Sequence, residues 1–271
     1  MTTVAIASPA RLGAALLVGV AIGTLGGLIG LGGAEFRLPL LVSLFAFVAL
    51  EAVIVNKAIS LVVVASALAF RQRVIPPDVL LAHWPIAVNL LAGSLVGAWL
   101  GADLATRLRA ATLYRVIAVL LLTIAVVLAF GHDPSAPAAP PVQGPTLIVL
   151  GLVAGVLIGG IASLLGVAGG EFLIPTLVLL FGLDIKLAGS LSLAISLPTM
   201  LVGFARYSRD RSFDVLRGNK TFVLVMAVGS ILGALLGAQL LGLVSGRILG
   251  PFLAALLVVS AVKMWAHSRR P

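Results

Sequence analysis

Two glycine-rich segments carry the chemistry that this sequence offers. Residues 30–39 read Gly-Leu-Gly-Gly-Ala-Glu-Phe-Arg-Leu-Pro, and residues 166–175 read Gly-Val-Ala-Gly-Gly-Glu-Phe-Leu-Ile-Pro. Consecutive glycines inside an apolar stretch interrupt a helix, because glycine loses the most backbone entropy on ordering. The helix that resumes after each break starts with free N–H groups and about half a positive charge, which favour an anion. The pattern therefore predicts an anion site at two half-helix N-termini.

Arg37 is the most distinctive side chain of these segments. It occurs only in the first one, opposite Leu173, and its guanidinium fork suits a planar or tetrahedral oxyanion. Two alternatives for Arg37 stay open, namely snorkelling to a membrane surface and an ion pair with Glu35. Serines in the following apolar runs could line an anion pathway or bond back to their own helix. The expected binding residues are Gly30, Gly32, Gly33, Ala34, Glu35, Arg37, Asn56, Gly166, Gly169, Gly170, Glu171, Ser192 and Ser196.

Glu35 and Glu171 complicate an anion site, because an ionised carboxylate would repel the substrate. We favour the interpretation that each is the N-cap of the helix that follows the break. The alternative is that one of them carries a proton together with the anion. Pro39 and Pro175 are expected inside the first turns of these helices, where a missing N–H costs least. We expect Lys57 to anchor the cytoplasmic end of a span.

The composition requires a membrane around these segments. Of 271 residues, 61% are hydrophobic and only 10% charged, with a mean hydropathy of +1.23. A water-facing surface needs about 25% charged residues, so a soluble or nucleic-acid-binding protein is excluded. The net charge of +9 fits Lys and Arg held at the cytoplasmic ends of spans. With no Cys, three His and nine acidic residues, we expect no metal, no cofactor and no enzyme activity.

The chain repeats itself after 136 residues without a gap. Matches in Gly, Pro, Glu and Asp are informative, because chance matches in apolar sequence fall mainly on Leu and Val. Residues 58–61 read Ala-Ile-Ser-Leu and recur at 194–197. The matched pairs include Gly30 with Gly166, Gly33 with Gly169, Glu35 with Glu171, Phe36 with Phe172, and Pro39 with Pro175. We therefore expect two homologous membrane repeats, residues 1–131 and 146–271, joined by a Pro-rich linker at 132–145.

Each repeat contains five apolar runs. A long run (12–31; 146–167) precedes the break, and a short one (37–50; 173–183) follows it. A medium run (57–70; 190–205) and two full-length runs come next (80–102 and 112–130; 219–243 and 249–266). A span needs about 20 apolar residues, so the short runs are expected to be half-helices. The expected fold is an all-α, polytopic membrane protein of about eight to ten membrane segments.

The distribution of Lys and Arg favours inverted repeats. If all five runs of each repeat cross the membrane, Lys and Arg divide 13 to 4 between the two sides, with Arg37 left inside. If only four cross, the repeats are parallel and the division is 11 to 6. The steeper division favours inversion, with both termini cytoplasmic.

Two ladders of glycines four residues apart predict close helix packing. Such spacing makes a groove along one helix face, into which another helix fits. The structural glycines are Gly93 and Gly97 in the first repeat, and Gly229 and Gly233 in the second.

The G-x-G-G-x-x-F-x-x-P segment, its second copy and the duplicated layout resemble the sulfite exporter TauE/SafE family of bacterial membrane transporters. The resemblance covers almost the whole chain. It implies transport of sulfite or an organosulfonate across the bacterial inner membrane. Ala34 and Ala168 replace glycines of the family's pattern, and alanine adopts positive φ less readily, so we expect the two loops to differ in shape.

We therefore expect a secondary transporter that works by alternating access at the paired breaks. Its partners are a small anion and the lipid bilayer, with proton coupling through Glu35 or Glu171 as a hypothesis. The alternatives are an anion channel, and a transporter of another small anion or of a cation bound by the two glutamates. A membrane enzyme or assembly factor is a more distant alternative. The sequence leaves the oligomeric state open.

Overall fold

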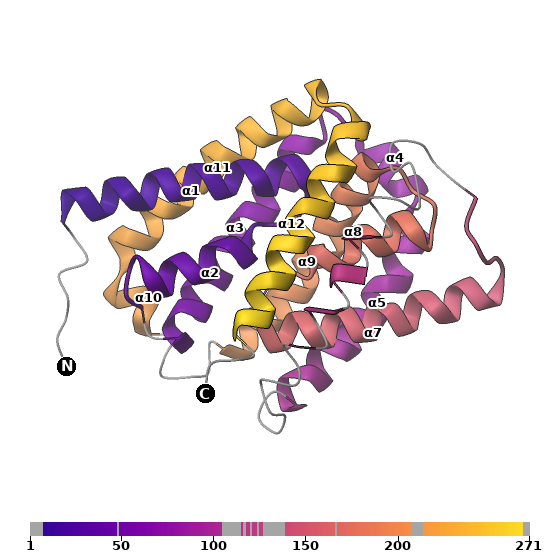
Figure 1. Ribbon diagram of the computed structural model, residues 1–271, viewed down its shortest axis with the longest axis horizontal. Helices are drawn as coiled ribbons and strands as arrows, with labels where there is room; N and C mark the ends of the chain where they lie inside the picture. The colour runs from indigo at the N-terminus through magenta and orange to yellow at the C-terminus, as the bar shows by residue number, and fades with distance from the viewer. Residues whose placement is uncertain are drawn as a thin grey trace.

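All regular structure in the described part of the chain is helical. The computed structural model describes residues 8–47, 49–104, 115, 118–119, 121–123, 125–126, 139–165, 167–207 and 214–267. The first half contains α1 (Pro9–Ile29), α2 (Ala34–Ser43), α3 (Ala49–Arg71), α4 (Pro77–Ala82) and α5 (Trp84–Leu104) (Figure 1). The second half contains α7 (Pro145–Leu165), α8 (Gly170–Leu179), α9 (Ile185–Tyr207), α10 (Asp214–Gly218), α11 (Lys220–Leu243) and α12 (Gly246–His267).

Five of these helices are long and apolar enough to cross a membrane. They are Pro9–Ile29, Glu51–Arg71, Pro145–Ser163, Ile185–Val202 and Lys220–Leu243. The shorter apolar helices are Trp84–Leu100, Gly170–Leu179 and Gly246–Val262. This confirms the prediction of an all-helical membrane protein. Most of the run predicted at 112–130 lies outside the described residues.

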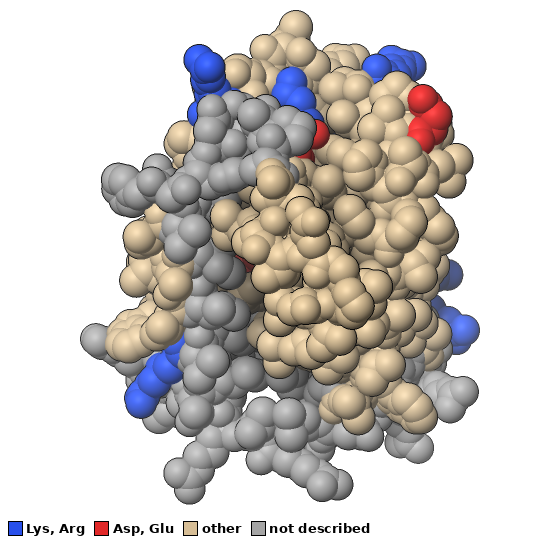
Figure 2. All heavy atoms as spheres, turned by 90° about the vertical axis from the view of Figure 1, so that its right-hand side faces the viewer, with Lys and Arg blue, Asp and Glu red and all other residues tan. Residues whose placement is uncertain are grey.

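The outer surface is apolar where a lipid-facing surface should be. On α11, Leu224, Val228, Leu232 and Leu236 recur every fourth residue, and each is about half exposed or more. Figure 2 shows one face on which uncharged residues cover most of the described surface. Gly229 and Gly233 lie between these positions in the sequence and are buried, so α11 presents leucine and valine outward and glycine inward.

The glycine ladders lie where helices of the two halves touch. A Cβ atom on Gly233 would approach Thr24 N of α1 to 2.7 Å, and one on Gly97 would approach Val156 C of α7 to 2.7 Å. Only a residue without a side chain fits such an approach. Successive glycines of α11 meet successive turns of α1, so these two helices run in the same direction. The pair α5 and α7 is built in the same way.

Helices α3 and α9 form the centre of the fold and run in opposite directions. The last residue of α3, Arg71, contacts both the last turn of α1 and the first turn of α9. Each central helix has 23 residues, so both are longer than the predicted runs 57–70 and 190–205. In α3 the difference arises because Asn56, a polar residue, lowers the apolar signal although it is buried.

Candidate functional site

The first helix break is built from glycines in left-handed backbone conformations. Helix α1 ends at Ile29 with Gly30 as its C-cap at φ 96°, and Gly32 and Gly33 follow with φ 80° and 71°. Positive φ costs glycine nothing, whereas a residue with a Cβ is strained there. The G-x-G-G spacing therefore reverses the chain and starts α2 at Ala34.

The second break repeats this geometry in part. Gly169, with φ 78°, is the N-cap of α8, as Gly33 is of α2. Gly166 lies outside the described residues. Ala168 stands 136 residues after Gly32 and, unlike it, does not have a positive φ. The two loops therefore differ in shape where alanine replaces glycine.

The two breaks touch each other. A Cβ atom on Gly32 would lie 3.5 Å from Ala168 Cβ, and one on Gly170 would lie 2.9 Å from Leu31 Cα and 3.3 Å from Gly30 O. Two half-helices thus begin at one place. The first N–H groups of any helix lack partners within it, and each N-terminus carries a partial positive charge.

Arg37 brings a full positive charge to this place. Its side chain is completely buried, and Nη1 donates hydrogen bonds to Asn56 Oδ1 (3.3 Å) and Ser60 Oγ (2.7 Å). Asn56 Nδ2 in turn donates to Ala34 O at the start of α2 (3.0 Å). The alternative that Arg37 snorkels to a membrane surface is wrong, because the side chain is 0% exposed and is held between α2 and α3.

Helix α9 contacts both breaks with one face. Gly189 packs against Gly30, whose Cβ position would lie 2.7 Å from Gly189 Cα, and Ser196 Oγ donates to Ala168 O at 2.9 Å. Ser192 lies between them on the same face, since residues three and four apart share a helix face. It is fully buried, and its hydroxyl has no hydrogen-bond partner within the described part of the chain.

The glutamates and prolines lie elsewhere than predicted. Because Gly33 and Gly169 occupy the N-cap positions, the interpretation of Glu35 and Glu171 as N-caps is wrong. Each is the second residue of its helix, and the Glu171 side chain is buried at 7% exposure. Acidic residues in a first turn are still favoured by the helix dipole.

Pro39 and Pro175 are each the sixth residue of a helix, so they fall in its second turn rather than its first. A proline there cannot donate to the carbonyl four residues earlier. That carbonyl belongs to Glu35 in α2 and to Glu171 in α8. The prolines therefore weaken the first turn of both half-helices.

Two further cations lie inside the protein. Lys57 is 2% exposed, so the prediction that it anchors a span end at the membrane surface is wrong. Arg71, which the sequence analysis missed, is 1% exposed and bonds to α1 and α9. The sequence feature that could have identified Arg71 is an arginine at the end of an apolar run. The equivalent position in the second half is Tyr207, so the repeat does not require an arginine there.

Comparison with known proteins identifies the class of protein to which this site belongs. The model of one protein family, described as Sulfite exporter TauE/SafE, matches residues 15–264. The chain belongs to this family. Its members are membrane transporters, so the chain is a multi-pass transporter and not an enzyme. Searches of curated proteins and of solved structures found no match. The residues of the two helix breaks, Arg37, Asn56, Lys57, Arg71 and Ser192 all lie within the matched range of the TauE/SafE family.

Proposed function

We propose that this TauE/SafE transporter carries a small sulfur oxyanion or sulfonate, such as sulfite, and binds it where α2 and α8 begin. The observation that carries the proposal is the contact between two half-helix N-termini beside the buried guanidinium of Arg37. Paired broken helices are the typical binding site of secondary transporters, and helix N-termini favour anions. The description of the family names sulfite, which supports the choice of anion.

Several polar groups around the two breaks could bind the anion together. The N-terminal N–H groups of α2 and α8 would donate to the oxyanion, and Arg37 would neutralise its charge. Asn56 and Ser60 orient the guanidinium by holding Nη1. The buried Ser192 hydroxyl lies on the helix face that touches both breaks and could donate a further hydrogen bond.

We further propose that residues 1–131 and 146–271 are inverted repeats, joined by the linker at 132–145. Helices α1, α2, α3 and α5 begin at residues 9, 34, 49 and 84, and α7, α8, α9 and α11 begin 136 residues later in each case. Figure 1 supports the inversion, because α1 and α7 run in opposite directions. Movement of one repeat against the other would expose the site to each side of the membrane in turn.

The orientation of the transporter in the membrane follows from the same topology. We propose that the transporter lies in a bacterial inner membrane with both termini in the cytoplasm. With inverted repeats, and with the buried Lys57 and Arg71 left out, 12 Lys and Arg residues fall on the cytoplasmic side and 3 on the other. Proton coupling through Glu171 or Glu35 remains part of the proposal, because both lie in the first turn beside the anion site.

A cation substrate has less support. Among the described residues, no group of three or more His, Cys, Asp or Glu side chains could hold a metal ion. An anion channel would share the same broken helices. It would pass ions far faster than a binding-site cycle allows, so single-channel recording distinguishes it from the proposed carrier.

Uptake into proteoliposomes tests the proposal. Wild-type protein should take up labelled sulfite, with competition by sulfonates and none by divalent metal ions. Arg37→Gln should weaken the apparent affinity by roughly 10- to 100-fold, because one charge-assisted hydrogen bond contributes about 1.5–3 kcal/mol. Arg73→Gln is the control, since Arg73 is exposed in the turn after α3. Equal affinity in wild type and Arg37→Gln would contradict the site.

A further inference from the structure

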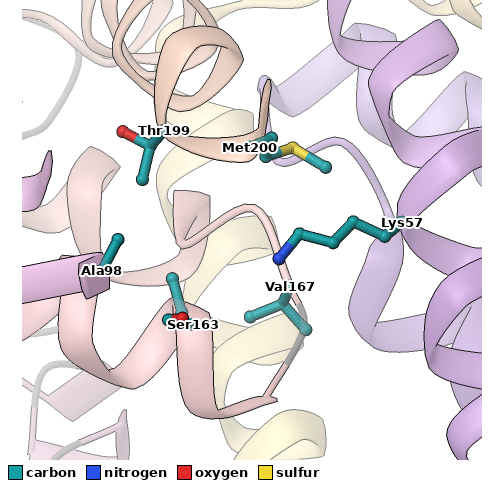
Figure 3. A pocket seen from close by; sticks show the side chains of 7 residues that line it. Lys57, Ala98, Ser163, Val167, Thr199 and Met200 are labelled. Atoms are coloured by element: carbon teal, nitrogen blue, oxygen red, sulfur yellow. The ribbon is translucent and has the colours of Figure 1, made fainter. Parts of the chain in front are cut away.

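A small, partly open cavity lies between the two halves of the transporter, next to the Arg37 site. Its walls come from α3 and α5 of the first half, and from α7, the second break and α9 of the second half (Figure 3). The volume that the centre of a water molecule can occupy is about 10 Å³, so the cavity has room for about one water. The lining residues are Lys57, Ala98, Ala162, Ser163, Val167, Thr199 and Met200.

Lys57 gives this cavity a positive charge. Its side chain extends from α3, and the ammonium group points into the cavity between Val167 and Met200 (Figure 3). Ser163 and Thr199 add hydroxyl groups to the same lining. The equivalent residue in the second half is Leu193, so the fold itself does not require a lysine. An ionisable residue inside a membrane span is expensive and marks a functional pathway by default.

The cavity adjoins the proposed anion site on two sides. Val167, in its wall, belongs to the second break, and its neighbour Ala168 accepts a hydrogen bond from Ser196. On α3, Lys57 directly follows Asn56, which holds Arg37. Consecutive residues of a helix point about 100° apart, so Lys57 and Asn56, the α3 residue that holds Arg37, lie on neighbouring faces of the same turn of α3.

We propose that the Lys57 cavity is a second anion station, which holds the oxyanion group of the substrate as it moves to or from the Arg37 site. The inference rests on the proposed function. In this conformation the cavity has room for about one water, and sulfite needs more room. Both halves of the chain form its walls, so their relative movement in alternating access would enlarge it. The unbranched Met200 side chain can also move aside at little cost.

Substitution of Lys57 tests the second station in the full-length protein. Lys57→Met keeps the length and volume of the side chain and removes the charge, so the thermal midpoint should not fall. Sulfite uptake should drop at least 10-fold, and the loss should be greater for the sulfite dianion than for monovalent methanesulfonate. Lys57→Arg retains the charge and should retain part of the uptake. A merely structural lysine would not change the preference between the two anions.

A second variant tests the cavity without changing any charge. Ala98→Leu places extra volume in the cavity and should lower sulfite uptake, whereas Ala92→Leu on the exposed face of α5 should not. This pair remains informative if Lys57→Met fails to fold. Wild-type uptake in either Lys57→Met or Ala98→Leu would overturn the inference. If Arg37→Gln still weakened the apparent affinity for sulfite as predicted, the proposed function would survive. If the wild type itself bound no sulfur oxyanion, the proposed function would fail.

Discussion

The Arg71 guanidinium donates a hydrogen bond to the Ser190 hydroxyl at 2.9 Å, so the last residue of α3 is bound to the first turns of α9. Nη1 also donates to Gly27 O and Leu28 O, at 2.9 Å each, and Nη2 donates to Lys186 O at 2.7 Å. The last carbonyls of a helix lack partners within it and carry a partial negative charge, which a cation stabilises. One buried side chain thus holds α1, α3 and α9 together where the first break begins.

Loss of the Arg71 guanidinium should destabilise the transporter. Arg71→Met removes four hydrogen bonds and leaves the carbonyls of α1 and α9 buried without their donor. Removing one member of a buried charged network typically costs about 3–5 kcal/mol. We therefore expect the apparent thermal midpoint in detergent to fall by roughly 10 °C. Arg71→Lys should recover only part of this, because an ammonium group cannot reproduce the planar fork.

The matched control for Arg71 is Arg73→Met, two residues further along the chain. Arg73 is exposed, so its loss should move the midpoint little. If Arg71→Met were as stable as Arg73→Met, the network would not hold the three helices together.

Asn56 should be needed to position Arg37. Asn56→Ala removes one of the two acceptors for Arg37 Nη1 and the donor to Ala34 O, so both stability and anion affinity should fall. Asn56→Asp separates the two effects. Its carboxylate still accepts from Arg37 but neutralises the guanidinium, so sulfite affinity should fall at least as far. Titration calorimetry with sulfite and thermal unfolding measure these quantities.

Asn219→Ala is the control for Asn56. Asn219 is half-buried before α11, and its side-chain amide donates to the nearby Val215 O. Unchanged sulfite affinity in both Asn56 variants would show that Asn56 does not position the anion-binding arginine.

Removal of the Ser192 hydroxyl should separate stability from binding. A buried hydroxyl without a partner costs about 1–3 kcal/mol, so Ser192→Ala should leave the midpoint unchanged or raise it. The same variant should weaken sulfite binding, because we place this hydroxyl beside the anion. If the thermal midpoint rose and the affinity for sulfite did not change, Ser192 would not be part of the anion site.

The sequence alone predicts the breaks well and the buried cations poorly. Gly33 and Gly169 need positive φ, which is a local property that the residue type reveals. The sequence predicts that Lys57 lies at the end of a span, because the apolar run starts there. Helix α3 in fact begins eight residues earlier, at Ala49. Arg71 also closes an apolar run, and such a cation usually faces lipid headgroups. Its burial depends on α1 and α9 arriving from other parts of the chain, which no local pattern records.

The helix starts explain the remaining errors. The sequence predicts that the apolar run after the first break starts at residue 37, because Glu35 interrupts the apolar pattern. Helix α2 in fact starts at Ala34, so Pro39 falls in its second turn. The shift also changes Glu35 from a cap to a residue within the helix, and the same shift applies to Glu171 in α8.

Glycine substitutions should distinguish packing from helix propensity. Gly233→Ala places a methyl group 2.7 Å from Thr24 N and 2.9 Å from Val20 C, so α1 and α11 must separate. We expect a loss of stability of about 1–3 kcal/mol, typical of an overpacked site. Gly13→Ala is the control, because nothing lies within 4 Å of its Cβ position. It should be neutral or stabilise α1 by up to about 1 kcal/mol. Equal effects in the two variants would contradict the close packing.

Glu171 should couple transport to protons if the anion and a proton move together. Glu171 is buried in the first turn of α8, close to where the anion would bind. A neutral glutamine keeps the shape but cannot carry a proton. We expect an imposed pH gradient to accelerate sulfite uptake by the wild type and to have no effect on Glu171→Gln, whose sulfite binding should persist. Glu51→Gln, in the first turn of α3, is the control and should respond as the wild type does. If the pH gradient did not change sulfite uptake by the wild type, proton coupling would be ruled out. The proposed anion site would still stand.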